Sequence, residues 1–359
     1  MTAGLSPEVR RYIGRMSGSV EAADEVNKAM IRIWCEMLED ANPLYTDEAY
    51  ARSSEYGGII SPPTMVLTWA MPAYWPAPHL PPDALIDQMD LPLGELPLNL
   101  SVESTDEYIL PLRPGDKLHY RTRLDNVTPL KKTRLGTGHF ITTTTFYHNQ
   151  REELVATHLH VLFRYRGAEQ QQPALQGSGV PGDGSPEGPG TGIATLTSGG
   201  HGDVGDSPQR KASPVGSHTV FWEDVGPGMD IPAVSLELDM VRMIMAAAGT
   251  RDLYPIHHDR EFAREAGHKD MLVNVISQGG FLGRCITDWT GPAGKLRRLR
   301  VASAFPCYLG DMIMAFGKVT RKYVEDGEHR VDCQLYITKQ DGVVGVNSEA
   351  SVVLPSRTA

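Results

Sequence analysis

The stretch Asp252-Leu-Tyr-Pro-Ile-His257 decides the fold, because a related stretch, Asp40-Ala-Asn-Pro-Leu-Tyr45, lies 212 positions earlier in the same chain. The two stretches share the acid, the proline and the aliphatic residue after it, and they differ at the last position. A histidine titrates near neutral pH and can move protons, whereas a tyrosine normally cannot. The pair therefore predicts a doubled fold with one working site and one inactive site.

The repeat extends beyond these six residues. With the same shift of 212 positions, residues 40–60 align without a gap on the second half, so that Asp47 meets Asp259. Each half later contains a Gly-Asp pair, Gly115-Asp116 and Gly310-Asp311, before sequence that alternates in the manner of a strand. A repeat of this length indicates two copies of one structural unit.

The boundary between the two units is expected in a segment of low complexity, rich in Gly, Pro and Gln. Such a composition cannot bury enough apolar surface to offset the entropy lost on ordering. A chain of 359 residues is also long enough for two domains of ordinary size. We therefore expect an N-terminal domain at residues 1–166, a flexible linker at 167–216 and a C-terminal domain at 217–359.

Each unit is predicted to be α+β, with helices followed by several long strands. The helices are expected at 22–38 and 238–248, near 259–267, and, as a long apolar central helix, from 274 to about 288; in the first half the central helix should begin near Pro62-Pro63. The strands are expected at 118–127, 138–147 and 154–165, and at 299–305, 312–319, 330–338 and 343–354. A sheet wrapped around one buried helix explains why the central helix is apolar nearly all round.

Composition excludes several classes of function. The net charge of −10 with no dominant basic face argues against nucleic acid as a main partner. The four cysteines form no CxxC pair, which predicts neither a zinc site nor a disulfide framework and fits a reducing cytoplasm. No signal peptide and no bilayer-spanning apolar run is recognisable. We expect a soluble, cytoplasmic protein with no metal site and no membrane partner.

The motif and its surroundings resemble a known family. The order Asp252-x-x-Pro-Ile-His257, a short helix ending in Ala266-Gly267, a central helix, and Gly310-Asp311 before the strands resembles the MaoC-like enoyl-CoA hydratases, which have the hotdog fold. Two such units with catalytic residues only in the second resemble the double-hotdog (R)-specific hydratases. Residues 56–65, Tyr-Gly-Gly-Ile-Ile-Ser-Pro-Pro-Thr-Met, are also similar to the inactive MaoC-like subunit of bacterial steroid side-chain hydratases. The resemblance covers most of the chain outside the expected linker.

This resemblance implies the roles of the candidate catalytic residues. Hydration of a 2-enoyl thioester needs a base for water, an acid for C2 and donors for the thioester oxygen. His257 would deprotonate the water, and Asp252 would hold it and relay the proton. The first turn of the central helix, at Asn274 and Val275, would supply the oxyanion donor. The implied product is a (3R)-hydroxyacyl-CoA, and no cofactor is needed because coenzyme A is part of the substrate.

Two positions depart from the family pattern and leave the substrate class open. Tyr254 stands where the family has Asn, which makes it a candidate substrate contact. Asn274-Val275 stand where the family has His-Gly at the start of the central helix. Without the resemblance, Asp252 and His257 could instead satisfy backbone donors in a turn and cap a helix. The neighbouring His258 is expected at the surface or in a cap.

Two further segments are open to two interpretations each. The basic run that contains Arg297 and Arg298 could contact CoA phosphates or form a solvated strand edge. Residues 69–82, rich in aromatic, Met and Pro residues, could cover a large apolar ligand or form a packed surface loop. In the first half, loss of the partner of Asp40 would free space for a bulky acyl group.

The leading hypothesis is a double-hotdog enoyl-CoA hydratase that acts on a bulky acyl-CoA, such as one with a steroid side chain. The alternatives are a dehydratase of 3-hydroxyacyl thioesters, a hydratase of a small branched acyl-CoA, and a non-catalytic acyl-CoA-binding subunit. The two units would form a pseudo-dimer within one chain, and a further homodimer is left open.

Overall fold

The computed structural model describes residues 5–76, 91–133, 135–167, 218–303 and 305–358. The first half contains helices and then long strands: α1 (Pro7–Arg10), β1 (Val20–Glu21), α2 (Lys28–Leu38), α3 (Pro43–Thr46), α4 (Glu48–Ser53), η1 (Pro63–Met65), α5 (Val66–Ala70), β2 (Leu98–Tyr108), β3 (His119–Val127), β4 (Lys131–Lys132), β5 (Gly136–His148) and β6 (Leu154–Gly167). Apart from Gly167, the expected linker lies outside the described residues.

The second half repeats this order. Its elements are η2 (Trp222–Asp224), β7 (Asp230–Glu237), α6 (Met240–Thr250), η3 (Pro255–His257), α7 (Arg260–Glu265), α8 (Val275–Thr290), β8 (Lys295–Ser303), β9 (Met312–Glu325), β10 (Glu328–Lys339) and β11 (Val344–Val353). None of the helices in the described part of the chain combines the length and apolarity needed to cross a bilayer.

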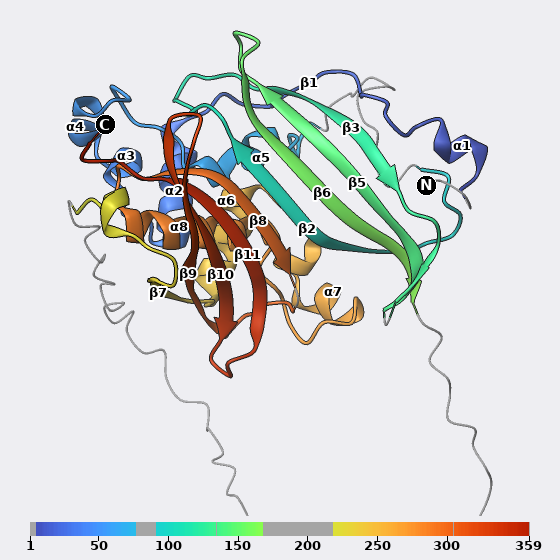
Figure 1. Ribbon diagram of the computed structural model, residues 1–359. Coiled ribbons are helices and arrows are strands. Elements are labelled where there is room, and N and C mark those ends of the chain that lie inside the picture. The colour runs from blue at the N-terminus through green and yellow to red at the C-terminus, as the bar shows by residue number, and fades with distance from the viewer. Residues whose placement is uncertain (1–4, 77–90, 134, 168–217, 304, 359) are drawn as a thin grey trace, which may run out of the picture.

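The long strands form one continuous antiparallel sheet, in the order β1-β3-β5-β6-β2-β8-β11-β10-β9-β7. The two halves meet where β2 pairs with β8, with Ser104 opposite Val301 and Asp106 opposite Leu299. The principal helices lie on one side of this sheet (Figure 1). Each half is thus a sheet curved over helices, the hotdog arrangement, and the predicted α+β double hotdog is confirmed.

The two halves also share individual hydrogen bonds. In the first half the carboxylate of Asp116 accepts from the backbone N–H three residues earlier at 2.8 Å and from Gln150 Nε2 at 3.2 Å. In the second half Asp311 accepts from the corresponding N–H at 2.8 Å and from Gln340 Nε2 at 3.4 Å. The two Gly-Asp pairs therefore brace the same turn in both units.

The helices differ from the sequence expectation in two places. The helix expected at 22–38 begins only at Lys28, because the side chain of Asn27 caps it by accepting from Met30 N. In the first half the central helix is short and ends at Ala70. Met71 precedes a proline and has an extended backbone (φ −63°, ψ 133°), which stops the helix there.

The second-half central helix, α8, packs directly against the first half. Most of its residues are buried, and it belongs to a hydrophobic core that draws side chains from both halves. Gly280 makes this close approach possible, since a methyl group at its Cα would lie 2.6 Å from Trp34 Cζ2 and 2.7 Å from Leu38 Cδ1. The two halves therefore share one core and are not independent units.

We expect Gly280→Ala to destabilise the protein by about 1–3 kcal/mol, because the added methyl group overpacks the contact with α2. The neighbouring Gly279→Ala is the matched control, since its methyl group would meet nothing nearer than 3.9 Å. Alanine at that helical position should stabilise by up to about 1 kcal/mol. Urea unfolding of both variants measures the difference, and equal stability of the two would contradict this account of the α2–α8 contact.

Candidate active site

The Asp252–His257 motif follows directly from the end of α6. Arg251 ends that helix in the left-handed conformation (φ 59°), as Glu39 does at the end of α2 in the other half (φ 55°). The residue before Pro255 has an extended backbone (ψ 131°), and the motif then closes as the single 3-10 turn η3. The expected irregular loop is therefore a tight turn, which brings His257 back beside Asp252.

The His257 ring is oriented by one backbone hydrogen bond. Its Nδ1 lies 2.8 Å from the carbonyl oxygen of Leu272, which can only accept, so the proton of the neutral ring is on Nδ1. The unprotonated Nε2 then faces Asp252 Oδ2 at 3.4 Å. That separation is long for a direct bond but lets one water contact both groups. His257 is thereby arranged to act as a base.

The N-terminus of α8 is organised by Asn274. Its Oδ1 accepts from Ser277 N at 2.8 Å, and its Nδ2 donates to Thr250 Oγ1 at 2.7 Å, which ties α8 to the end of α6. The cap satisfies the Ser277 N–H but not the two before it. The N–H groups of Val275 and Ile276 therefore have no acceptor among the described residues. They can both donate to an oxygen of developing negative charge.

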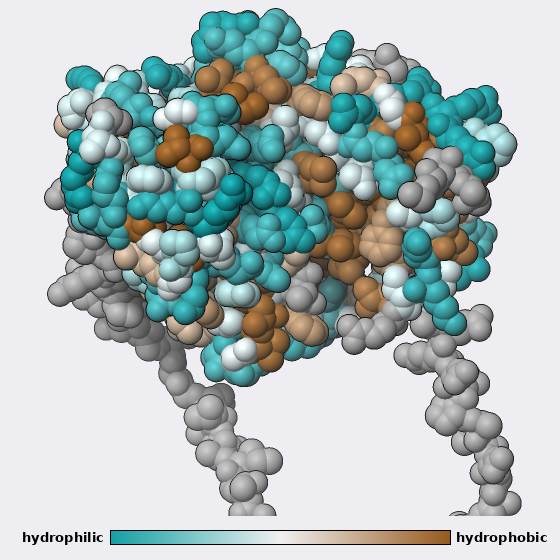
Figure 2. Space-filling model, in the orientation of Figure 1, coloured by the Kyte–Doolittle hydropathy of each residue, from teal (hydrophilic) through white to brown (hydrophobic). Residues whose placement is uncertain are grey.

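These groups line one cavity of about 530 Å³. It includes Asp252, His257, the first turn of α8 and Tyr254, whose ring stands edge-on to His257 with centroids 6.4 Å apart. Tyr254 is 55% exposed and lies at the rim. In Figure 2 apolar side chains gather in a hollow over the region where β2 and α7 lie in Figure 1. The size and lining suit an apolar acyl group.

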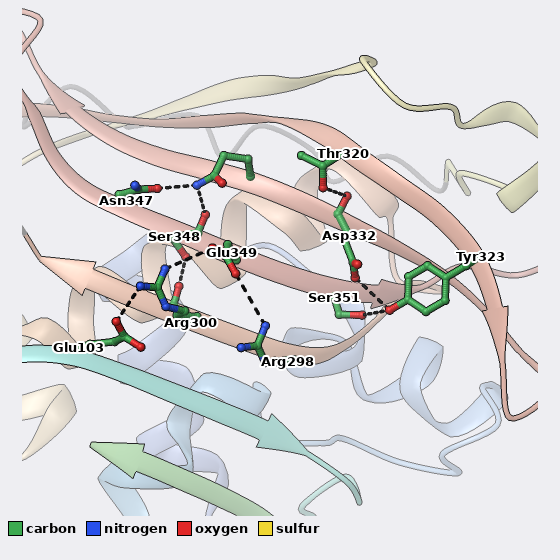
Figure 3. Close-up of polar contacts among 11 residues, drawn as sticks. Glu103, Arg298, Arg300, Thr320, Tyr323, Asp332, Asn347, Ser348, Glu349 and Ser351 are labelled. Carbon is green, nitrogen blue, oxygen red and sulfur yellow. Dashed lines mark hydrogen bonds and ion pairs between the residues drawn. The ribbon is translucent and has the colours of Figure 1, made fainter. Parts of the chain in front are cut away.

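Arg297 and Arg298 do not belong to this cavity. Side chains alternate along β8, so Leu299 and Val301 line the cavity while Arg298 and Arg300 lie on the opposite face. There Arg298 pairs with Glu349, within the polar network of Figure 3. Arg297 Nη2 pairs with a glutamate on β10 at 2.5 Å. Strand β8 pairs with β2 on one side and β11 on the other, so neither arginine stands at an edge of the sheet. Contact of Arg297 or Arg298 with CoA phosphates stays a prediction.

The related site in the first half has lost two chemical groups. Tyr45 stands in the position of His257. By the shift of 212 positions Pro63, which has no N–H, stands in the position of Val275 at the start of the helix. Burial raises the pKa of Asp40 to about 7. The cavity beside Tyr45 holds about 80 Å³, and a separate cavity of about 420 Å³ is lined by Asp40. That this half gives room for a bulky acyl group stays a prediction. The expected cover at 69–82 lies partly outside the described residues.

The cavity also includes residues that the sequence did not single out. Its wall on the first half is polar and carries Ser101, Asp106, His158 and His160. The sequence could have revealed the two histidines, because His-x-His within a predicted strand puts both rings on one face of the sheet. His268 lines the other side, and burial, together with the nearby His257, lowers its pKa.

Within the described ranges, no three side chains converge in a way that would hold a metal ion.

Comparison with known proteins identifies the family. Residues 11–158 match the FAS1-like dehydratase domain region. A solved MaoC-like dehydratase superimposes with a TM-score of 0.69 at 20% identity, over 97% of this chain and 100% of that one. The 3-oxo-4,17-pregnadiene-20-carboxyl-CoA hydratase beta subunit of Mycobacterium tuberculosis is 34% identical over 100 residues, which are 28% of this chain and 76% of that subunit. The chain belongs to the MaoC-like enoyl-CoA hydratase family.

A further relative covers a different share of this MaoC-like chain. The probable enoyl-CoA hydratase alpha subunit of Thermomonospora curvata is 35% identical over 169 residues, or 46% of this chain. The chain spans 53% of the length of that subunit. Family membership therefore rests on sequence identity, and the double hotdog fold rests on superposition over nearly the whole chain.

Proposed function

We propose that this protein adds water to a 2-enoyl-CoA thioester and forms a (3R)-3-hydroxyacyl-CoA. The observation that carries the proposal is the meeting of His257 Nε2, Asp252 and the N–H groups of Val275 and Ile276 in one cavity. These are the three functions that hydration requires: a base, a proton relay and an oxyanion site.

The reaction follows from this geometry. A water held between His257 and Asp252 loses a proton to the pair as its oxygen bonds to C3. The electrons of the double bond move toward the thioester carbonyl, whose oxygen accepts hydrogen bonds from the first turn of α8. The proton then passes through Asp252 to C2, so that the elements of one water are added. The reverse reaction, dehydration, uses the same groups.

We infer further that the acyl group is bulky, as in a steroid side chain. Two observations support this. The cavity of about 530 Å³ extends from the reacting groups to the sheet of the first half. Two relatives, the alpha and beta subunits from Mycobacterium tuberculosis, are named as hydratases of a 3-oxo-pregnadiene carboxyl-CoA.

A panel of enoyl-CoA thioesters tests both parts of the proposal. We expect loss of the enoyl-thioester absorbance with steroid enoyl-CoA, at a kcat/KM well above that for crotonyl-CoA. Chromatography against both 3-hydroxy epimers would identify the product as 3R. Turnover of crotonyl-CoA alone would overturn the bulky acyl group but keep the hydratase. No turnover of any thioester, with tight acyl-CoA binding, would favour a non-catalytic binding subunit.

A further inference from the structure

The polar wall of the cavity contains two histidines, each paired with another polar side chain. His158 Nδ1 lies 2.7 Å from Asp106 Oδ1, and His160 Nε2 lies 2.9 Å from Ser101 Oγ. The two rings stack with centroids 5.7 Å apart. The side chains of Asp106 and His158 are only 10% and 12% exposed, so they are removed from bulk solvent but open to the cavity.

The repeated fold shows that the sheet itself does not need these groups. Asp106 lies ten residues before Asp116, and Val301 lies ten before Asp311, so the two positions correspond. Asp106 pairs with His158 across β2 and β6, and Val301 pairs with Ser348 across β8 and β11.

The next pair along the sheet shows the same contrast. Ser104 pairs with His160 in the first half, where Leu299 pairs with Ala350 in the second. At the same register, the second half thus has small or apolar side chains below its long central helix. The first half has a carboxylate and two imidazoles, and these line the cavity.

We propose that Ser101, Asp106, His158 and His160 form a second subsite, which recognises a hydroxyl group on the acyl group away from the thioester. This subsite rests on the proposed function, because the reacting carbons must lie at His257 and α8. A group that reaches the β2–β6 wall is therefore another part of the same acyl group.

The charges of the cavity select a neutral oxygen over an anion. Its lining includes the carboxylates Asp106 and Asp252 and, among the described residues, no lysine or arginine. Burial and the neighbouring His158 lower the pKa of His160 to about 3, which keeps that ring neutral. The Asp106 carboxylate accepts the Nδ1 proton of His158, so the unprotonated His158 Nε2 can only accept and is left to bond a ligand hydroxyl. A carboxylate ligand would find like charge here and a ketone would find no donor on His158, whereas a hydroxyl can donate to His158 Nε2.

The test compares two enoyl-CoA substrates that differ only in this oxygen, a 3-hydroxy steroid enoyl-CoA and its 3-deoxy counterpart. We expect the wild-type protein to prefer the 3-hydroxy substrate at least about tenfold in kcat/KM, because loss of one buried hydrogen-bond partner leaves polar groups unpaired. The double variant Asp106→Val/His158→Ser introduces the residues of the second half. It should reduce the ratio to about one.

Control measurements distinguish loss of the subsite from misfolding and from failure of the proposed function. Glu107→Gln, on the exposed face of β2, should retain the preference. If the double variant does not fold, His158→Gln replaces it. If neither substrate is hydrated, the proposed function fails, and calorimetric affinities of the saturated 3-hydroxy and 3-deoxy acyl-CoA esters then test the subsite alone. Equal values for the two ligands in the wild type, or an unchanged ratio in the variant, would overturn the subsite.

Discussion

His257→Ala and Asp252→Asn are each expected to lower kcat by at least about 100-fold, the contribution of one general acid–base group. The Leu272 carbonyl fixes the proton on His257 Nδ1, so Nε2 is the ring atom that can accept a proton from water in the proposed reaction. Asparagine at position 252 keeps the shape of the side chain but cannot accept and return a proton. Steady-state hydration of the best thioester in the panel measures both effects.

The matched control is His258→Ala. His258 is exposed, and its Nε2 lies 3.0 Å from the Leu253 carbonyl oxygen, so its loss should leave kcat unchanged. The double variant of the catalytic pair should be little slower than the slower single variant, because residues that act as a unit are not additive. Wild-type turnover in either single variant would refute the assignment of the pair.

The second large effect is expected from Val275→Pro, which removes one N–H from the first turn of α8 and leaves the side-chain volume similar. Loss of one oxyanion donor lowers kcat by roughly 10²–10³. Proline is tolerated at the first position of a helix, and Asn274 before it already has the extended backbone that proline requires (φ −73°, ψ 160°). By the shift of 212 positions, proline already stands at the corresponding position, Pro63, in the first half.

Val275→Ala is the control, because it shortens the side chain and keeps the N–H. It should retain most of the activity, and thermal unfolding should give similar Tm values for the two variants. A fully active, folded Val275→Pro protein would show that the thioester oxygen does not use this donor.

The repeat made most of the fold predictable. The shift of 212 positions and the two Gly-Asp pairs predicted two like units, and the long strands lie close to their expected positions. Strand β2 was missed for a physical reason. Its apolar alternation stops after Val102, because the buried positions that follow are Ser104 and Asp106.

The catalytic motif could be located from sequence, but the extent of its cavity could not. Asp252 and His257 are five residues apart in one motif, whereas His158 comes from the other half of the chain and reaches the cavity only because β2 pairs with β8. The orientation of Arg298 was within reach of the sequence. It alternates with the apolar residues Leu299 and Val301, which indicates opposite faces of one strand.

The β2–β8 junction divides the cavity between the two halves of the chain, so proton transfer and ligand selectivity can depend on different halves. The proposed reacting groups, Asp252 and His257, stand on the second half, while much of the remaining cavity lining stands on the first. Substitutions along β2 and β6 can therefore alter which compound is accepted without moving the proton-transfer groups. The half without the Asp–His pair thus supplies a cavity lining whose selectivity can change separately from proton transfer.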